Sequence, residues 1–167
     1  MPNIRQSLLL ETEALPGHTL YAVIDAARSR SLLPLILDAD TERRCLFDYF
    51  EETRGMDRVA PWLVRLSGGS PDLFDHIAEE GLGEHWGIYL LSDAAIDPVA
   101  EHLAACLLHR SPEGRKMVFR FYDPRVLRSY LSHCPQGERT AFFGPVRRIL
   151  LENDLRELTP FGAPRDD

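Results

Sequence analysis

Four segments of the chain are apolar at nearly every position and rich in β-branched or aromatic residues: 19–25, 62–66, 86–91 and 116–122. Runs of this kind predict strands covered on both faces, as in parallel or mixed sheets. A shorter run, Arg147–Leu151, predicts one more strand. We therefore expect a central sheet of four to five strands.

Helical spacing of apolar residues is found between these runs. Residues 3–13 and 26–39 predict two helices, the second begun or kinked by its proline. Three more helices have a start signal in which a capping side chain accepts a backbone N–H and a proline follows. The signals are Ser70-Pro71, Asp97-Pro98 and Asp123-Pro124. We therefore assign structural roles to Asp97, Pro98, Asp123 and Pro124.

Strands and helices alternate along the chain, which predicts an α/β fold with a mixed or mostly parallel central sheet flanked by helices. A length of 167 residues suits one compact domain. Residues 1–18 are expected to form an N-terminal helical segment, and residues 19–158 the α/β domain. The polar, proline-containing stretch 159–167 is expected to be a frayed tail.

The charge balance narrows the classes of partner. Acidic residues outnumber basic ones by 26 to 19, and the resulting charge of −7 opposes binding to nucleic acid. No apolar stretch has the length of a membrane span, and the start lacks the apolar region of a signal peptide. Cys45, Cys106 and Cys134 are odd in number and widely spaced, unlike a secreted disulfide framework. We expect a cytoplasmic protein with no nucleic-acid or membrane partner.

Two motifs have the composition of a ligand site. Ser67–Pro71 places two glycines before a helix start, where N–H groups can bind an anion. It matches neither the dinucleotide nor the Walker pattern, and a turn ending in a cap is the simpler explanation. His102, Cys106 and His109 share one helix face, but no second cluster has the spacing of further zinc ligands. We predict no metal and no cofactor.

An enzymatic role would need polar side chains at strand ends, where α/β enzymes bind ligands. Asp25, Ser67, Ser92 and Asp123 occupy such positions. Strand termination and helix capping explain the same residues, and the chain has no Gly-x-Ser-x-Gly nucleophile motif. We assign no catalytic residue. A small enzyme or ligand-binding protein with a polar site of Asp25, Arg120 and Asp123 is the alternative.

Two arginines lie where their charge needs an explanation. Arg120 is in the middle of the apolar run 116–122, and a guanidinium buried there must be paired. Arg125 is one residue into the next predicted helix, at the end where the helix dipole disfavours a cation. Both positions indicate a structural ion pair or a contact with a partner.

The segment Phe119-Arg120-Phe121-Tyr122-Asp123-Pro124-Arg125-Val126-Leu127 resembles the signature of the DUF4123 family, the adaptor-chaperones of bacterial type VI secretion. Other segments resemble family elements in the right order: Leu20–Ala27, Ala60–Val64, Trp86-Gly87-Ile88 with Ser92, and Phe142–Pro145. The resemblance covers about residues 19–150. It implies a non-enzymatic protein that binds a toxic effector and helps to load it onto the VgrG spike.

The resemblance supplies no catalytic residues and implies a surface that binds protein. Aromatic and arginine side chains are common anchors of such surfaces. The candidates for partner binding are Arg120, Arg125, Trp62, Phe142 and Phe143, with Tyr49 and Phe50 as further aromatics. Packing in the core is the alternative for the aromatic residues. Many family members carry a further C-terminal lobe, and this chain ends soon after residue 145. The charge of −7 predicts steering toward a basic effector surface.

Overall fold

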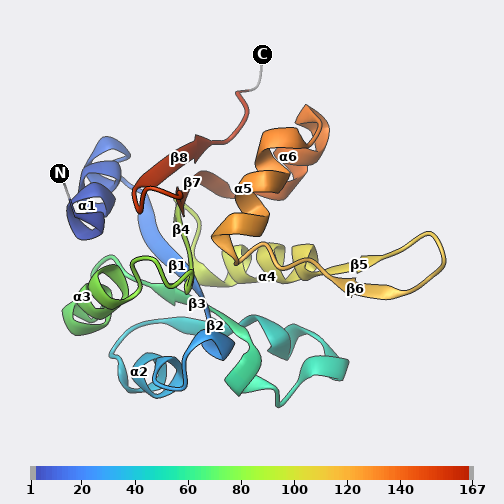
Figure 1. Cartoon of the computed structure of the whole chain (residues 1–167), viewed down its shortest axis with the longest axis horizontal. Helices are drawn as coiled ribbons and strands as arrows, with labels where there is room; N and C mark the ends of the chain where they lie inside the picture. The colour runs from blue at the N-terminus through green and yellow to red at the C-terminus, as the bar shows by residue number, and fades with distance from the viewer. Residues whose placement is uncertain (1–2, 166–167) are drawn as a thin grey trace.

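The computed structural model describes residues 3–165, and its centre is a six-stranded sheet in the order β2-β3-β1-β4-β7-β8 (Figure 1). Every neighbouring pair in this sheet is antiparallel. The strands are β1 (Thr19–Asp25), β2 (Arg43–Cys45), β3 (Pro61–Arg65), β4 (Gly87–Ser92), β7 (Val146–Glu152) and β8 (Leu158–Gly162). The fold is α/β, but the prediction of a mixed or mostly parallel sheet of four to five strands is wrong.

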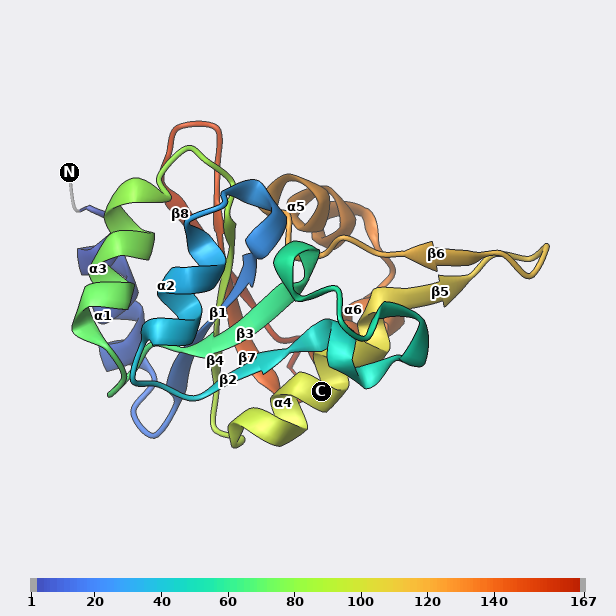
Figure 2. The ribbon, with the colours of Figure 1, turned by 90° about the horizontal axis from the view of Figure 1, so that it is seen from below.

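Helices cover both faces of the sheet, and this explains the error. On one face lie α1 (Ile4–Ala14), α2 (Leu32–Asp38) and α3 (Pro71–Glu80); on the other lie α4 (Ile96–Leu107), α5 (Pro124–His133) and α6 (Gln136–Phe143) (Figures 1 and 2). β1 is consequently buried at every position but its first. A strand covered on both faces is apolar throughout, whichever way its neighbours run. The hydrophobic pattern located the strands and left their direction open.

The run 116–122 does not form a strand of the central sheet. Only Lys116–Val118 (β6) is a strand, and it pairs with β5 (Leu108–Arg110) in a separate hairpin that projects from the body (Figure 2). Residues 119–123 have no strand structure: the chain turns at Phe121 and Tyr122, which are both buried, and α5 follows. The apolar pattern there reflects packing at the base of the hairpin. Arg120 is therefore not in a strand, contrary to the prediction.

Four short 3₁₀ turns complete the body. They are η1 (Ala26–Arg28), η2 (Leu46–Tyr49), η3 (Glu51–Thr53) and η4 (Asp57–Val59). The first follows β1 and the other three connect β2 to β3, in the teal to green part of the ribbon. Their Leu46 and Phe47 are buried, while most of residues 48–59 are exposed. This connection therefore lies on the surface beside the sheet.

The capping prediction is confirmed for Ser70 and Asp123, whose side chains each accept a backbone N–H in the first turn of α3 and α5. It is wrong for Asp97. α4 begins at the buried Ile96, so Asp97 lies inside its first turn and does not cap it. The Asp97 carboxylate instead pairs with Arg44 of β2, at 2.7 Å.

The N-terminal segment agrees with its prediction, whereas the C-terminal segment predicted to be frayed contains a strand. α1 matches the expected N-terminal helix, apart from residues 1–2, which lie outside the described residues. The expected frayed tail contains most of β8; its residues 166–167 also lie outside the described part. No helix within residues 3–165 has the length and apolar composition needed to cross a bilayer.

β8 forms one edge of the sheet and carries a proline on its outer side. Ala163 N–H donates to Arg147 C=O at 2.9 Å, and Asn153 N–H donates to Glu157 C=O at 2.8 Å. Hydrogen bonds alternate along an antiparallel pair, so the backbone of Pro160 faces away from β7. Proline has no N–H to offer a further strand. This edge is closed to additional pairing at that position.

Candidate protein-binding face

Two arginine–carboxylate pairs meet in the turn that follows the hairpin. The guanidinium of Arg120 donates to the carboxylate of Asp25, at 3.2 Å, and Asp25 is buried at the end of β1. Arg125 donates to both oxygens of Asp123, at 3.0 and 2.8 Å. The N–H of Asp123 donates to the C=O of Arg120 at 3.1 Å, which holds the two pairs together. The residues of the predicted polar site are neighbours, and each carboxylate is engaged by an arginine.

The environment of each carboxylate sets its pKa. Burial raises the pKa of Asp25, against the opposing effects of the Ala27 N–H and of Arg120. Burial also acts to raise the pKa of Asp123, but its hydrogen bonds from Arg125 hold that pKa below the ordinary value. Both carboxylates therefore have structural partners, and Asp123 is ionised at neutral pH.

The arginines themselves are half exposed. The side chain of Arg120 is 54% exposed and that of Arg125 is 50% exposed. The guanidinium of Arg120 also lies 5.8 Å from the centre of the Tyr122 ring, a cation–π arrangement. The prediction that Arg120 is buried in a strand is wrong, because its charged end reaches solvent. Both arginines are accessible to a partner.

Three aromatic residues predicted as anchors lie inside the protein. Trp62, Phe142 and Phe143 are all buried. The indole N–H of Trp62 donates to the C=O of Asp57 at 3.0 Å. Phe142 stacks edge-on with its neighbours, including Tyr130 at 5.8 Å between ring centres. These residues belong to the core, which was the alternative for them.

The hairpin of β5 and β6 is exposed on both faces. Phe119 N–H donates to Leu107 C=O at 2.7 Å at its base, and Gly114 turns the chain at its tip with a φ of +81°. Met117 is 56% exposed and Val118 46% exposed. The ring of Phe119 anchors the base by packing 4.9 Å from that of Tyr130. The hairpin is therefore a fixed stem that carries uncovered apolar side chains.

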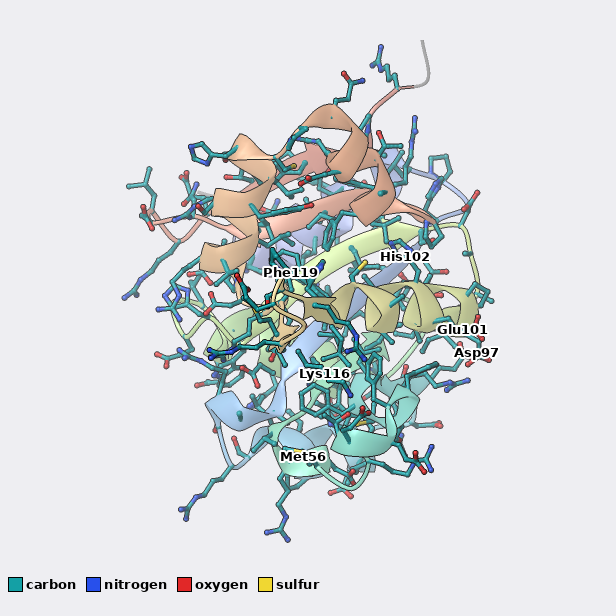
Figure 3. All side chains as sticks on the ribbon, turned by 90° about the vertical axis from the view of Figure 1, so that its right-hand side faces the viewer. Met56, Asp97, Glu101, His102, Lys116 and Phe119 are labelled. Carbon is teal, nitrogen blue, oxygen red and sulfur yellow. The ribbon has the colours of Figure 1, made fainter. Side chains whose placement is uncertain are left out.

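The hairpin also differs from the rest of the chain in charge. Arg110, Arg115 and Lys116 outnumber its single carboxylate, Glu113, on a chain whose net charge is −7. The ammonium of Lys116 contacts the carboxylate of Glu52 in η3, which connects the hairpin to the exposed segment below it. Figure 3 shows Lys116 and Met56 on the same side of the molecule. The Lys116–Glu52 contact thus joins the hairpin to residues 48–59.

A groove of about 870 Å³ lies between α2 and η4, next to the end of residues 48–59. One side is formed by Leu33, Pro34 and Leu37 of α2, and the other by Val59 of η4. The groove is closed by Ala26 and Ala27 of η1. Among residues 3–165, ten large apolar side chains are exposed, and six of them lie on α2, η2, η4, β6 or the connection between η3 and η4. We call these six the exposed apolar face: Leu37, Tyr49, Met56, Val59, Met117 and Val118.

The family model described as a domain of unknown function, DUF4123, matches residues 20–141 of this chain. That stretch holds β1, the hairpin, the arginine pairs and the exposed apolar face. The chain belongs to the DUF4123 family. Comparison with curated proteins and with solved structures gives no match.

The DUF4123 match ends inside α6, yet the fold continues beyond it. β7 and β8 follow the matched region, and β7 lies between β4 and β8 in the central sheet.

The segment Trp86-Gly87-Ile88 lies at the start of β4, where a side chain at Gly87 would overlap the C=O of Val23. The glycine is thus required by the close approach of β1.

Of the three positions considered as metal ligands, His109 leaves the group, whereas Cys106 Sγ stays 3.8 Å from His102 Nε2. α4 ends at Leu107, so His109 lies on β5 and not on the helix that carries His102 and Cys106. The ring of His102 hydrogen-bonds to the C=O of Phe142 at 2.6 Å. The shared helix face predicted for the three residues is therefore wrong.

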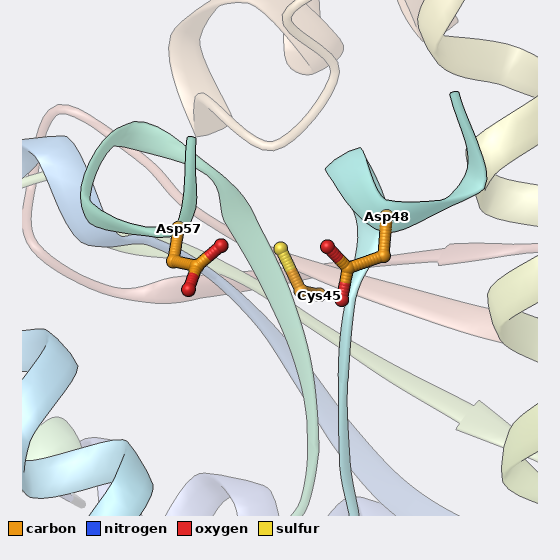
Figure 4. A group of neighbouring side chains, drawn as sticks. All are labelled: Cys45, Asp48 and Asp57. Carbon is orange, nitrogen blue, oxygen red and sulfur yellow. The ribbon is translucent and has the colours of Figure 1, made fainter. Parts of the chain in front are cut away.

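A different group, Cys45, Asp48 and Asp57, brings its ligand atoms within 4.8 Å of one another (Figure 4). Cys45 is buried, whereas both aspartates are exposed. Burial, with the nearby carboxylates, raises the pKa of the Cys45 thiol to about 11. Metals bind the thiolate, so the protonated thiol opposes metal binding at neutral pH.

The glycine turn before α3 has a packing explanation. A Cβ at Gly69 would overlap the hydroxyl of Thr41, which donates to the C=O of Arg65 at 2.7 Å. The Ser67 hydroxyl accepts the N–H of Leu20 at 2.7 Å. These contacts account for the small residues of the turn.

Sequence reasoning missed the hairpin and the groove. The turn residues Ser111-Pro112-Glu113-Gly114 between two short apolar runs are a signal from which the hairpin could have been found. The groove leaves no local signal, because its sides come from α2 and η4, which are about twenty residues apart in the sequence. Of the predicted aromatic anchors, Tyr49 is exposed.

Proposed function

We propose that this DUF4123 protein is a cytoplasmic adaptor that binds a type VI secretion effector and helps to load it onto the VgrG spike. The exposed apolar face is the observation that carries the proposal. Large apolar side chains that are exposed on neighbouring elements are candidates for protein interaction, because leaving them in water is unfavourable. The resemblance of residues 119–127 to the signature of the adaptor family indicates which class of partner to test.

The hairpin is suited to contact a protein partner. Its base is held by the Phe119 and Tyr130 rings, while Met117 and Val118 remain uncovered. A two-stranded hairpin buries little apolar surface by itself, so contact with a partner supplies the burial that it lacks. Basic residues beside the apolar pair add attraction to acidic groups of that partner.

The test is co-expression with candidate effector and VgrG spike proteins sought among the neighbouring genes, followed by size-exclusion chromatography. We expect a stable complex. The double variant Met117→Asp, Val118→Asp is expected to lower affinity at least tenfold, whereas Leu155→Asp leaves it unchanged. Leu155 is a matched control because it is an exposed leucine in the loop between β7 and β8, outside the exposed apolar face.

Two results together would refute the proposal. One is that the purified protein binds neither the effector nor the spike. The other is that deleting its gene leaves effector delivery intact in a secretion assay. Loss of binding in Leu155→Asp to the same degree as in the hairpin variant would instead show that the hairpin is not the contact.

A further inference from the structure

The groove between α2 and η4 opens to solvent. Ala27, Pro34, Leu37 and Val59 line it and are exposed to solvent. Small-molecule sites bury most of their ligand's surface, which an open trough of this kind does not do. The volume of about 870 Å³ therefore fits side chains presented by a larger molecule.

The elements that line the groove indicate the secondary structure of the segment that it binds. Its lining comes from α2, η1, η4 and the connection between η1 and α2, so no strand edge is available for pairing with an extended peptide. A helix needs no backbone pairing and presents apolar side chains along one face. α2 has seven residues, so it is roughly 10 Å long and matches about two turns of a partner helix.

The charged residues at the edge of the groove indicate which side chains flank the apolar stripe of that helix. Arg30 lies in the segment before α2 and Arg58 in η4, on opposite sides of the groove. Both are exposed, and neither forms an ion pair within residues 3–165. Asp38 is the single acidic residue of the lining. Acidic residues on both flanks of an occupant would meet these two guanidinium groups.

We propose that this groove binds an amphipathic helix of the partner protein, with an apolar stripe seated against Leu37 and Val59 and acidic side chains facing Arg30 and Arg58. The inference rests on the proposed function for the source of the helix, which is the effector. It adds the chemistry of the segment that the protein recognises, and it places that segment at the α2–η4 groove and not at the hairpin.

The experiment uses the full chain and two synthetic 14-residue helical peptides measured by fluorescence anisotropy. Both carry leucines at helical spacing on one face; one has glutamates on its flanks and the other has lysines. We expect the glutamate peptide to bind at least tenfold more tightly. Arg30→Glu combined with Arg58→Glu is expected to reverse this preference. Leu37→Asp should lower the affinity for the glutamate peptide at least tenfold, and Leu155→Asp should leave it unchanged.

Two outcomes would overturn the inference: neither peptide binds, or Leu37→Asp binds the glutamate peptide as tightly as the native protein does. If neither peptide binds while laurate binds the groove in an NMR titration, the groove is a small-ligand site. Failure here is distinguishable from failure of the proposed function. An effector complex that survives Leu37→Asp refutes the groove alone, whereas tight peptide binding without an effector complex refutes the adaptor role alone.

Discussion

The buried carboxylate of Asp25 is paired with the half-exposed guanidinium of Arg120, 95 residues later in the chain. Asp25 ends β1, in the middle of the sheet, and Arg120 follows the hairpin. The same carboxylate accepts the N–H of Ala27 at 3.0 Å and so caps η1, which closes the groove. One residue therefore connects the sheet, the groove and the base of the hairpin.

Arg120→Ala is expected to destabilise the fold only modestly. The Asp25 carboxylate keeps its bond from Ala27, and half of the guanidinium is already in solvent. We expect the free energy of unfolding to fall by about 1 kcal/mol, against the roughly 3–5 kcal/mol for breaking a fully buried pair. Urea denaturation measures the difference. A loss of the larger size would mean that Arg120 acts as a buried ion.

The stability costs of Asp123→Ala and Asp97→Ala compare an aspartate that caps a helix with one that does not. Asp123 caps α5 and binds Arg125, so its loss is expected to cost about 1 kcal/mol at pH 7. Its folded pKa is lowered, so this stabilisation is complete above the unfolded pKa and is lost as pH falls through the folded pKa, below about pH 4. Asp97→Ala removes an exposed ion pair and should cost clearly less than Asp123→Ala. Equal costs at pH 7 would contradict this assignment.

Glu152→Gln is expected to stabilise the protein at neutral pH. Glu152 is buried on β7 and accepts the N–H of Gly83 at 2.7 Å, a bond that glutamine can keep. Burial raises the pKa of Glu152, so the folded state holds its proton to a higher pH than the unfolded state. Stability from this group therefore declines as pH rises through the folded pKa. The melting temperature of Glu152→Gln should exceed that of the native protein at pH 7.5, and the difference should be smaller at pH 4.5. The exposed Glu80→Gln serves as control, and a pH-independent effect would argue against this origin.

Phe121→Ala tests the aromatic cluster at the hairpin base. The ring is fully buried beside those of Phe119 and Phe142, so truncation is expected to cost about 3–5 kcal/mol. Val118→Ala, three residues earlier and exposed, should change stability by less than about 0.5 kcal/mol. Chemical denaturation of both variants makes the comparison. A large cost for Val118→Ala would show that the hairpin is packed against the body.

Two glycine-to-alanine substitutions are expected to have opposite effects. Gly87→Ala forces a Cβ into the C=O of Val23 and should prevent accumulation of folded protein or lower its melting temperature sharply. Gly137 lies in α6 with nothing near the position of a Cβ. Gly137→Ala is expected to add about 0.5–1 kcal/mol, because alanine favours the helix. A tolerated Gly87→Ala would mean that β1 and β4 can move apart.

The sequence predicted well those elements whose pattern depends on local burial and local capping. β1 has the bounds expected for it, and α3 begins after Ser70 and ends before Gly81 as predicted. Strand direction was not predictable, because β1 has helices on both faces and its neighbours β3 and β4 come from distant segments. The pairing partners of a strand are a property of the whole chain.

The same division holds for the candidate site. The positive charge of Arg125 at a helix start indicated an ion pair or a contact with a partner, and the structure pairs it locally with Asp123. The exposure of Arg120 and the burial of Phe142 were not accessible from the pattern, because both depend on the run 116–122 leaving the sheet and turning toward α5. An arginine among aromatic residues can reach solvent when the chain bends there, and no neighbouring residue reveals the bend.

The place of β7 in the sheet also determines when the fold can close during synthesis. β4 is bound by β1 on one side and by β7 on the other, and about 53 residues separate the end of β4 from the start of β7. Until residue 152 has left the ribosome, the β7 side of β4 is an unpaired edge, which is a route to aggregation. A nascent chain of this protein thus stays vulnerable until β7 has emerged and paired with β4, and any slowing of translation over residues 93–145 lengthens that exposure.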